Sequence, residues 1–573
     1  MKVVIVGGVA GGASAAARLR RLDERMKIIM MEKGAYISYA NCGLPYYLSG
    51  VIKKEEDLII HTPESLAKRF NLDIRIRQEV VKINRDKKTV TVQDYLKKIA
   101  YEERYDKLIL APGAKPFYPP VKGLDSQKVF SLRNIPEVMA IKEFIQQKKP
   151  KRITIFGAGY IGIEVAENLK KAGFYVTIIE LMPQILGPLD YEMATLVHQH
   201  LKENEVEFYL SDPVKSIEHD GEIQILELAS GEKVKTDMII MGAGVRPENT
   251  LAKEADLEIG QTGGIKVNEY LQTSDPDIYA VGDAIEVIDY ITHDSTLVPL
   301  AGPANKQGRI AANNICGRKE TYSGTQGTSI IKVFDMTVAT TGNNEKMLKR
   351  KNIAYQKSFT HSPSHAGYYP GASPISLKLL FSPSDGKILG AQAVGKEGVD
   401  KRIDVIATAI RSGLTVSDLE KLELCYAPPY GSAKDPVNIA GYVAHNIIKG
   451  DMEVFHWDEL EQYDLAKTII LDVRNPKECA AGMIKEAINI PLDELREKMT
   501  ELDKNKMILI YCQVGQRGYL AYRLLKLNGF EQIKNLSGGY KTYYPTTCRQ
   551  SNCPLYSYEK ILKSDMLEAD SKK

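Results

Sequence analysis

Residues 152–162 read RITIFGAGYIG, and this stretch decides the fold of the larger part of the chain. A strand pattern runs into a Gly-x-Gly-x-x-Gly turn, and a second strand pattern, residues 176–179, ends at Glu180. The glycines let the backbone approach a pyrophosphate, and a carboxylate 18 residues after Gly162 can accept hydrogen bonds from a ribose diol. The stretch therefore predicts a dinucleotide-binding unit, for which NADH is expected in preference to NADPH because a carboxylate repels a 2′-phosphate. Its expected cofactor-binding residues are Gly157, Gly159, Tyr160, Ile161, Gly162 and Glu180.

The N-terminus carries a second unit of the same kind. Residues 1–6 form an apolar strand pattern, the turn GGVAGG spans residues 7–12, and the next strand pattern, residues 27–31, ends at Glu32. Val9 stands at the second glycine position of the fingerprint, so this turn is the weaker signal. A lone fingerprint can be only a tight strand-to-helix turn, but two on one chain favour cofactor binding. The expected cofactor-binding residues here are Gly7, Gly8, Gly11, Gly12, Glu32 and Lys33.

Composition narrows the class of protein further. A chain of 573 residues exceeds the size of a single hydrophobic core, so several domains are expected. Its content of 44% apolar and 26% charged residues is that of an ordinary globular protein. A formal charge of +3 is too small to indicate a nucleic-acid-binding protein. The chain opens directly into a strand and has no apolar run long enough to span a bilayer. Seven scattered cysteines suggest neither a disulfide framework nor a metal site, so a reducing cytoplasm is expected.

Three further segments carry a resemblance to a known family. They are residues 108–113 (LILAPG), 242–247 (GAGVRP) and 273–283 (TSDPDIYAVGD). Their order resembles that of the two-dinucleotide flavoprotein disulfide reductases, in which the first unit holds FAD and the second holds NAD(P)H. By this resemblance Asp283 reaches the ribityl chain of FAD, although a carboxylate before Ala284 could instead cap a helix. The resemblance also implies cofactor contacts at Val80, Ala111, Gly113, Gly244 and Ala301, the last at a helix start beside the isoalloxazine.

Cys42 lies in residues 38–47 (SYANCGLPYY), where this family places its redox centre. Glutathione-reductase-like members carry a second cysteine five positions later, but position 47 here is Tyr47, so Cys42 is expected to act alone. Its reactivity would then depend on a lowered thiol pKa. Lone-cysteine members of the family include NADH peroxidases, water-forming NADH oxidases and coenzyme A disulfide reductases.

Two tyrosine-containing segments favour the last of these classes. Residues 364–372 (SHAGYYPGA) and 424–436 (LCYAPPYGSAKDP) resemble the dimerisation-domain signatures of coenzyme A disulfide reductases. The resemblance implies that Tyr368 and Tyr426 of a partner subunit approach Cys42 and supply a proton or hydrogen bond to a leaving thiolate. A homodimer is then required. Interface packing is the alternative role for such tyrosines.

The first predicted helix offers residues for a phosphate-bearing substrate. Arg18 and Arg21 are three residues apart and therefore share a helix face, and guanidinium groups suit the phosphates of coenzyme A. An ordinary solvated helix face is the competing interpretation. The residues that we expect to contact coenzyme A, several of them by resemblance, are Ser14, Arg18, Arg21, Ser38, Asn41 and Lys434.

The C-terminal part resembles a rhodanese domain. The resemblance rests on residues 469–478 (IILDVRNPKE), 484–491 (IKEAINIP) and 507–512 (MILIYC). Cys512 opens a loop that ends at Arg517 and leads into a helix expected near Gly518, so loop amides can stabilise a thiolate or a persulfide. This six-residue loop suits a single sulfur atom better than the longer loop of related phosphatases. Asp472 and Arg474 are expected to form a structural ion pair near it.

Together these features predict an α/β protein with two Rossmann-like dinucleotide-binding domains, an α+β dimerisation domain and a C-terminal α/β rhodanese domain. The expected boundaries are 1–112 with 245–320 for FAD, 113–244 for NAD, 321–448 for dimerisation, and 455–573 for the rhodanese domain and tail.

The function expected from these features is FAD-dependent reduction of coenzyme A persulfide, polysulfide or coenzyme A disulfide by NADH. Cys42 would attack the substrate and Cys512 would carry sulfur, in a homodimer with small-molecule substrates and no metal, nucleic acid or membrane. One alternative is an NADH oxidase or peroxidase in which Cys42 cycles through a sulfenic acid. The other is a sulfur-relay or redox-sensing protein. Cys316, Cys425 and Cys479 look structural, whereas Cys548 and Cys553 stay unassigned.

Overall fold

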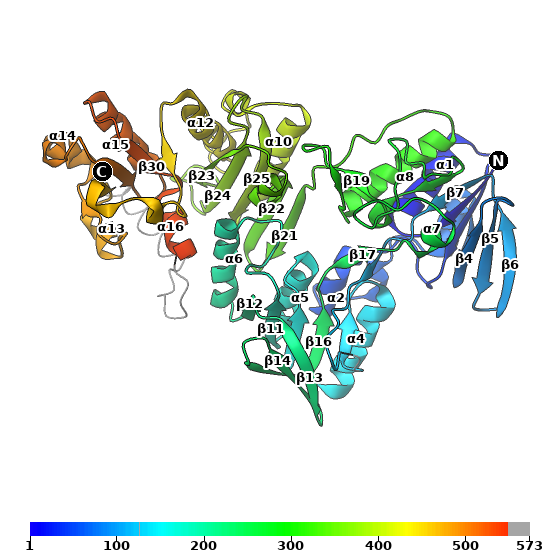
Figure 1. The fold of residues 1–573 in the computed structure, drawn as a ribbon. Coiled ribbons are helices and arrows are strands. Elements are labelled where there is room, and N and C mark those ends of the chain that lie inside the picture. Colours follow the sequence, from blue (N-terminus) through cyan, green and yellow to red (C-terminus); the bar gives the residue numbers. More distant parts are fainter. Residues whose placement is uncertain (125–126, 548–573) are drawn as a thin grey trace. The chain divides into compact units, whose positions relative to one another are not determined.

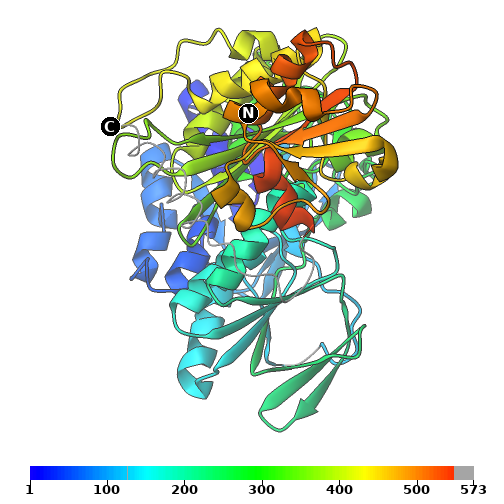
Figure 2. The same ribbon diagram turned by 90° about the vertical axis from the view of Figure 1, so that its left-hand side faces the viewer.

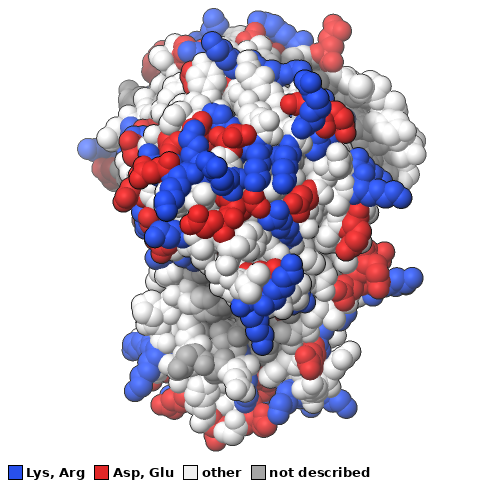
Figure 3. Space-filling view, turned by 90° about the vertical axis from the view of Figure 1, so that its right-hand side faces the viewer, with Lys and Arg blue, Asp and Glu red and all other residues white. Residues whose placement is uncertain are grey.

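The computed structural model describes residues 1–124 and 127–547. Its contacts divide the chain into two compact units. The first unit comprises Met1–Pro183 and Val206–Gly327, and the second comprises Gln184–Glu205 and the chain from Thr328 onward. Among the described residues, none of the helices combines the length and the apolar character needed to cross a membrane. Cationic and anionic side chains intermingle on the face shown in Figure 3.

A five-stranded parallel sheet forms the centre of the first dinucleotide-binding domain (Figure 1). Its order is β18 (Ile278–Ala280), β7 (Lys107–Leu110), β1 (Lys2–Val6), β2 (Lys27–Glu32) and β3 (Asp73–Ile76). Strands β1 and β2 are almost continuously apolar because both faces of the sheet are covered, as is usual in parallel sheets.

Helices α1 (Ala10–Leu22) and α8 (Ala301–Ile315) pack closely in this domain. A Cβ atom on Gly308 of α8 would lie 2.3 Å from the carbonyl oxygen of Gly11, so only glycine permits this approach. An antiparallel sheet of β4 (Gln78–Asn84), β5 (Thr89–Asp94) and β6 (Ile99–Arg104) completes the domain.

The second dinucleotide-binding domain repeats the arrangement. Its parallel sheet has the order β12 (Glu207–Leu210), β11 (Tyr175–Glu180), β10 (Arg152–Phe156), β16 (Met238–Met241) and β9 (Val129–Ser131). Helices α4 (Ile135–Lys148) and α5 (Tyr160–Lys171) belong to it, together with an antiparallel sheet of β13 (Val214–Asp220), β14 (Ile223–Leu228) and β15 (Lys233–Thr236). Helix α6 (Tyr191–Glu203) follows β11 in the chain but belongs to the second unit.

The second unit begins with an antiparallel sheet. Its order is β21 (Ser329–Val333), β22 (Met336–Gly342), β25 (Ile388–Gly395), β24 (Pro374–Phe381) and β23 (Gln356–Pro363). Helix α10 (Val399–Arg411) contacts β22 and β25, and helix α12 (Pro436–Lys449) contacts β23 and β24. All residues of β24 and β25 are buried, which makes these strands the centre of this layer.

The C-terminal part of the second unit has its own parallel sheet. The order is β26 (Val454–Phe455), β30 (Ile533–Leu536), β29 (Met507–Tyr511), β27 (Thr468–Asp472) and β28 (Ile488–Asn489). Helices α15 (Gln516–Leu527) and α16 (Gly539–Thr547) lie beside it, in orange and red in Figures 1 and 2, and α13 (Pro476–Ala480) follows β27. The buried residues of this sheet form a separate hydrophobic core that includes Phe455, Leu509 and Tyr511.

Candidate functional site

The first fingerprint forms a cradle that fits a dinucleotide. Gly7 has a φ of +99°, and a Cβ atom there would lie 2.2 Å from the carbonyl oxygen of Ala111. The carboxylate of Glu32 accepts hydrogen bonds from Gly8 N at 3.0 Å and from Gly34 N at 2.8 Å, which fixes it beside the glycine turn. Helix α1 begins without a side-chain cap, so its first amides are oriented towards the cradle.

The remaining residues predicted to hold FAD come from several elements of this domain. Lys33 follows β2, Gly113 follows β7, and Ala301 is the first residue of α8. Val80 is buried within the core on β4, which leaves its backbone as the group available to a ligand. Asp283 lies in the turn Gly282–Ala284 and makes no capping hydrogen bond there, and burial raises the pKa of its carboxyl. The alternative of a simple helix cap is therefore wrong.

The second fingerprint has the same geometry. Gly157 has a φ of +97°, and the carboxylate of Glu180 accepts a hydrogen bond from Ala158 N at 2.7 Å. A Cβ atom on Gly159 would meet no atom within 4 Å, so the space above this turn is open. Helix α5 starts at Tyr160 and Ile161 without a side-chain cap. This combination of an open cradle, helix amides and a ribose acceptor suits a nucleotide pyrophosphate.

Cys42 lies in a short turn, Asn41–Gly43, directly before helix α2 (Leu44–Leu48). The residue is exposed, yet protein atoms around the thiol and the negative charge of Glu164 raise the pKa of Cys42. The direction is opposite to the lowered pKa expected from the sequence. Tyr47, at the position of the missing second cysteine, is buried with the Nζ atom of Lys142 3.6 Å from its ring centroid, so it has a packing role.

Glu164 of α5 is a group near Cys42 that the sequence analysis missed. Burial and the charge of Glu167 raise the pKa of Glu164 to about 7, and a hydrogen bond from Tyr46 opposes this shift. Ser49, which follows α2, donates a hydrogen bond of 2.6 Å to Asn168 on α5. These contacts hold the segment around Cys42 against α5, the helix that follows the glycine turn of the second fingerprint. The sequence feature that could have indicated Glu164 is a carboxylate two residues after Gly162, inside a predicted helix.

The residues predicted to contact coenzyme A are divided between the two units. Ser14 donates a hydrogen bond of 2.7 Å to Asn305, and Arg18 donates one of 2.7 Å to Asn313, so both side chains face α8. Burial and three further arginines lower the pKa of Arg18. These neighbours of Arg18 are Arg21, Arg309 and Arg318.

Arg21 instead donates to Ala17 O within its own helix. Ser38 has a φ of +45° and donates its backbone N–H to Gly8 O, which places it beside the first fingerprint. Asn41 is exposed next to Cys42, whereas Lys434 is an exposed residue of the second unit.

Tyr368 and Tyr426 are brought together in the second unit. Their hydroxyl oxygens are 3.1 Å apart, and the residues are 76% and 50% exposed. The hydrogen bond between the two hydroxyls raises the pKa of Tyr368. The two loops are joined by a backbone hydrogen bond from Ala366 N to Gly431 O. The pair presents two adjacent phenol groups on one surface.

Cys512 follows β29 and is buried, with its Sγ atom accepting a hydrogen bond of 3.1 Å from Gly515 N. Gly515 has a φ of +101°, and α15 begins at the next residue, Gln516, two residues before the expected start. Tyr540 N donates to Cys512 O at 2.8 Å and fixes the loop from the other side. The amide at the sulfur and the helix start favour an anionic sulfur species.

Two ion pairs support this loop. Arg474 and Asp472 are fully buried and joined by a hydrogen bond of 2.7 Å, which supports the expected structural ion pair. Arg474 also donates to the side chain of Gln513 at 3.3 Å. Arg517 makes two hydrogen bonds to the carboxylate of Glu478, of 2.7 and 2.6 Å. Glu478 was not among the predicted site residues, since its partner lies 39 residues away.

Matches to known proteins cover nearly all of the described chain. Residues 1–308 match the pyridine nucleotide-disulphide oxidoreductase family, residues 328–435 its dimerisation domain, and residues 456–545 the rhodanese-like domain. A coenzyme A disulfide reductase of Staphylococcus haemolyticus is 36% identical over 447 residues, which cover 78% of this chain and 100% of that protein. The chain belongs to the pyridine nucleotide-disulphide oxidoreductases.

Solved structures of this family show the same architecture. The structure of reduced Bacillus anthracis CoADR-RHD is 52% identical, has a TM-score of 0.94, and matches over 95% of this chain and 98% of its own. A NAD-dependent persulfide reductase from A. fulgidus is 38% identical, with a TM-score of 0.89 over 95% of this chain and 100% of its own. These matches confirm the predicted family, the α/β fold class and the assignment of an enzyme that uses FAD and NADH.

The other cysteines of this oxidoreductase lie in different surroundings. Cys479 donates to Asp472 at 3.3 Å, and burial with the charge of Asp472 raises the pKa of Cys479 to about 12, which disfavours its thiolate form. Burial also raises the pKa of Cys316. Cys425 is exposed beside Tyr426 and does not have the buried position expected of a structural cysteine. Cys548 and Cys553 lie outside the described residues.

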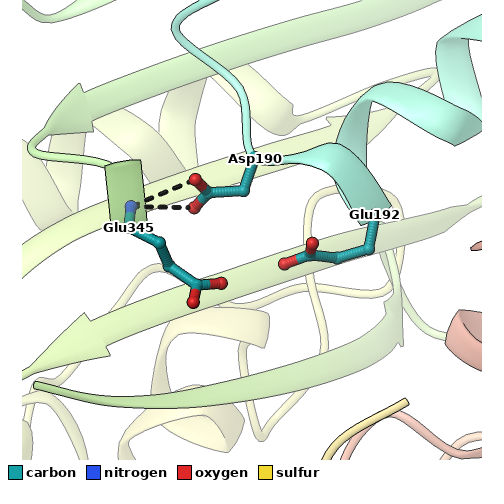
Figure 4. A group of neighbouring side chains, drawn as sticks. All are labelled: Asp190, Glu192 and Glu345. Carbon is teal, nitrogen blue, oxygen red and sulfur yellow. Dashed lines mark hydrogen bonds between the residues drawn. The ribbon is translucent and has the colours of Figure 1, made fainter. Parts of the chain in front are cut away.

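A buried acidic cluster in the second unit has the appearance of a metal site. It consists of Asp190, Glu192 and Glu345 (Figure 4), whose carboxylate oxygens lie within 4.8 Å of one another. Lys378 contacts all three carboxylates and is 2.7 Å from Asp190. The ammonium group therefore supplies the compensating positive charge, and the neighbouring charges raise the pKa of Lys378 and lower that of Glu345. The cluster joins α6 to the antiparallel sheet.

Proposed function

We propose that this oxidoreductase uses NADH to reduce coenzyme A persulfide, and also coenzyme A disulfide or polysulfide, with Cys512 carrying sulfur to or from the reaction. The observation that carries the proposal is the presence on one chain of a lone exposed cysteine beside the first fingerprint and a buried cysteine whose sulfur accepts a backbone N–H. The similarity to a structure described as a persulfide reductase supports the same substrate class.

The two fingerprints divide the cofactors between them. We assign FAD to the cradle of Gly7, Gly8, Gly12 and Glu32, and NADH to that of Gly157, Gly162 and Glu180. When bound, these cofactors supply an electron pair at Cys42. The glycine positions and the carboxylates fixed by Gly8 N and Ala158 N are those that a pyrophosphate and a ribose diol require. We also propose that the four domains have the expected boundaries, 1–112 with 245–320, 113–244, 321–448 and 455–573.

Cys42 performs the sulfur chemistry. Its thiolate attacks the inner sulfur of coenzyme A persulfide, a Cys42–coenzyme A disulfide bond forms, and the bond to the outer sulfur breaks with release of HS⁻. The electron pair then cleaves this mixed disulfide and returns Cys42 and coenzyme A as thiolates. Because the groups around Cys42 raise its pKa, formation of the attacking thiolate is sensitive to the charge of Glu164.

Tyr368 and Tyr426 supply the proton for the leaving thiolate in this account. Their adjacent hydroxyls are exposed, so they are available to a Cys42 of a second subunit. We therefore propose a homodimer formed through the dimerisation domain, in which each Cys42 is served by the partner's tyrosines. Ser14, Arg18, Arg21, Ser38, Asn41 and Lys434 are the residues proposed to hold coenzyme A.

Cys512 accepts or supplies the outer sulfur. Its thiolate attacks the terminal sulfur of a persulfide, a new S–S bond forms at Cys512, and the donor leaves as a thiolate. Gly515 N lies where it can stabilise the negative charge on Cys512 before and after transfer. Both cysteine reactions require free thiols, and a reducing cytoplasm provides that condition.

An NADH oxidase is the second candidate. It is favoured by the 36% identity, over 441 residues, to an NADH oxidase of Methanocaldococcus jannaschii, a match that covers 77% of this chain and 98% of that protein. In that reaction Cys42 would cycle through a sulfenic acid, and Cys512 would have no part.

The two candidates are separated by steady-state oxidation of NADH with different acceptors. Coenzyme A persulfide, coenzyme A disulfide, polysulfide, peroxide and oxygen are supplied separately to the FAD-loaded protein. We expect the persulfide to give the highest kcat/KM, with loss of turnover in Cys42→Ser. A higher kcat/KM for peroxide or oxygen, unaffected by Cys512→Ser, would favour the oxidase.

A further inference from the structure

The charge of the Cys512 loop limits the sulfur donors that it can use. The loop from Cys512 to Arg517 contains one formally charged side chain, that of Arg517, because Gln513, Val514 and Gln516 are neutral. Thiosulfate is a dianion and leaves as sulfite, another dianion, when its outer sulfur is transferred. A site that uses thiosulfate therefore needs positive charge at the loop, whereas a persulfide leaves as a monoanionic thiolate.

The one guanidinium in the loop is already paired with a carboxylate. Arg517 Nη1 and Nη2 donate to the two carboxylate oxygens of Glu478 at 2.7 and 2.6 Å. Such a bidentate pair is strong and fixes the orientation of the guanidinium. The side chains of Arg517 and Glu478 are only 27% and 16% exposed, so solvent screens the pair less than a surface pair. Glu478 is itself held by a hydrogen bond from Asn475 N at 3.0 Å.

Two other cationic residues contact the loop at Gln513. Arg474 donates to the Gln513 side chain, but it is paired with the buried Asp472 at 2.7 Å. Lys541 donates its backbone N–H to Gln513 O and is itself buried. What the loop offers to a donor is therefore the amide of Gly515 and the start of α15, which suit a single negative charge.

We propose that Glu478 determines donor specificity at Cys512 by neutralising Arg517, so that the loop takes sulfur from persulfides and rejects thiosulfate. The inference rests on the proposed role of Cys512 as a sulfur carrier. In the favoured reaction, the Cys512 thiolate attacks the terminal sulfur of R–S–SH, which gives Cys512–S–SH and R–S⁻. With thiosulfate the same attack gives Cys512–S–S⁻ and sulfite. Thiosulfate as reactant and sulfite as product are both dianions, and the neutral Arg517–Glu478 pair leaves no net positive charge to stabilise them.

The test compares two donors on the full-length, FAD-loaded protein. Glutathione persulfide and thiosulfate are supplied separately, and the gain of one sulfur atom on the peptide that holds Cys512 is followed by mass spectrometry over time and donor concentration. Cys512→Ser identifies the background signal. Glu478→Gln removes the negative charge but keeps an oxygen that can accept from Asn475 N.

Glu478→Gln is expected to raise the ratio of the kcat/KM for thiosulfate to that for glutathione persulfide by at least about tenfold, mainly through a lower KM for thiosulfate. Gln516→Lys adds a cation at an exposed position of the loop and is expected to change the ratio in the same direction, independently of how Glu478→Gln folds. Glu494→Gln removes a carboxylate of the same domain that pairs with Lys498 at the surface, and it serves as the control with an unchanged ratio.

Two results would overturn the inference. One is a wild-type Cys512 loaded by thiosulfate as efficiently as by glutathione persulfide, and the other is an unchanged donor ratio in both Glu478→Gln and Gln516→Lys. Failure of glutathione persulfide and thiosulfate alike to load wild-type Cys512 would instead contradict the proposed sulfur-carrier function, and with it the inference.

Discussion

The hydroxyl oxygens of Tyr368 and Tyr426 lie 3.1 Å apart, although 58 residues separate them in the sequence. Two phenols in contact can share one proton and deliver it to a leaving thiolate. A single exposed tyrosine is expected to be a weaker proton donor to that thiolate. We expect Tyr368→Phe and Tyr426→Phe each to lower kcat for coenzyme A disulfide by about ten- to a hundredfold. The double variant should be little worse than the weaker single variant, because the pair acts as a unit.

The kcat of each variant is compared with that of Tyr430→Phe, a tyrosine that is 71% exposed near the same loops. The pH profile separates a proton donor from a packing residue. Wild-type kcat should fall at alkaline pH as the pair ionises, whereas this decline should be absent from the double variant. Equal kcat values for the wild type and both single variants would rule out the assigned role.

Glu164 is expected to oppose the ionisation of Cys42, in addition to the larger effect of burial. Burial raises the pKa of Glu164 to about 7, so above that pH its negative charge opposes formation of the Cys42 thiolate. Glu164→Gln should lower the pKa of Cys42 and increase its alkylation rate above pH 7 by roughly three- to tenfold. Below the ordinary pKa of a glutamate, where Glu164 is protonated, the two proteins should react alike.

The same substitution has a consequence for stability. A carboxyl whose pKa is raised in the folded state stabilises the fold below its unfolded pKa, and this contribution is lost as pH rises through about 7. Glu164→Gln should therefore unfold at a similar or higher temperature than the wild type above pH 7. The exposed Glu143→Gln serves as the control in both measurements. An alkylation rate that does not change at any pH would show that Glu164 does not act on Cys42.

Glu180 is expected to select the nucleotide. Its carboxylate is fixed by Ala158 N at the position of the ribose, where it disfavours a 2′-phosphate. Glu180→Ser should lower the ratio of NADH to NADPH kcat/KM by about ten- to a hundredfold. Glu207→Ser, on the adjacent strand β12, is the control. It tests whether the loss of any carboxylate from this sheet changes the nucleotide preference. A wild-type enzyme that uses NADPH as well as NADH would contradict the assignment.

Lys378 is expected to be essential for the stability of the second unit. Its ammonium group compensates three buried carboxylates, so Lys378→Met leaves them facing one another. The loss should be about 3–5 kcal/mol in the free energy of unfolding. Since the pKa of Glu345 is lowered in the folded protein, the stabilisation is present above the ordinary glutamate pKa and is lost as pH falls.

The difference between Lys378→Met and the wild type should therefore shrink in acid. Chemical denaturation at neutral and acidic pH measures both values, with the exposed Lys387→Met as the matched control. Addition of a divalent cation to Lys378→Met is a further check, because the vacated acidic cluster could then bind it. A variant as stable as the control at neutral pH would show that the cluster does not need the lysine.

The sequence was most informative where a residue type answers a local backbone requirement. The glycine turns after β1 and β10 and the carboxylates that end β2 and β11 could be predicted, because each depends on neighbours within one βαβ unit. The prediction that Cys42 acts alone rested on one position, Tyr47. These local patterns identified the family and the fold class.

The groups that tune each site could not be predicted in the same way. Glu164 acts on Cys42 from 122 positions away in the sequence, and Glu478 pairs with Arg517 across 39 residues. Their effects depend on burial and on the distance between charges, which only the folded chain determines. For the same reason neither the raised pKa of Cys42 nor the place of α6 in the second unit could be predicted from the sequence.

The most direct measurement of the central claim is the anaerobic reaction of the NADH-reduced, FAD-loaded protein with coenzyme A persulfide, followed by rapid-mixing absorbance and sulfide release. The account predicts fast reoxidation with one sulfide released per persulfide, retained in Cys512→Ser when the persulfide is supplied directly and abolished in Cys42→Ser. Reoxidation that is slow with the persulfide but fast with peroxide, or that persists in Cys42→Ser, would contradict it.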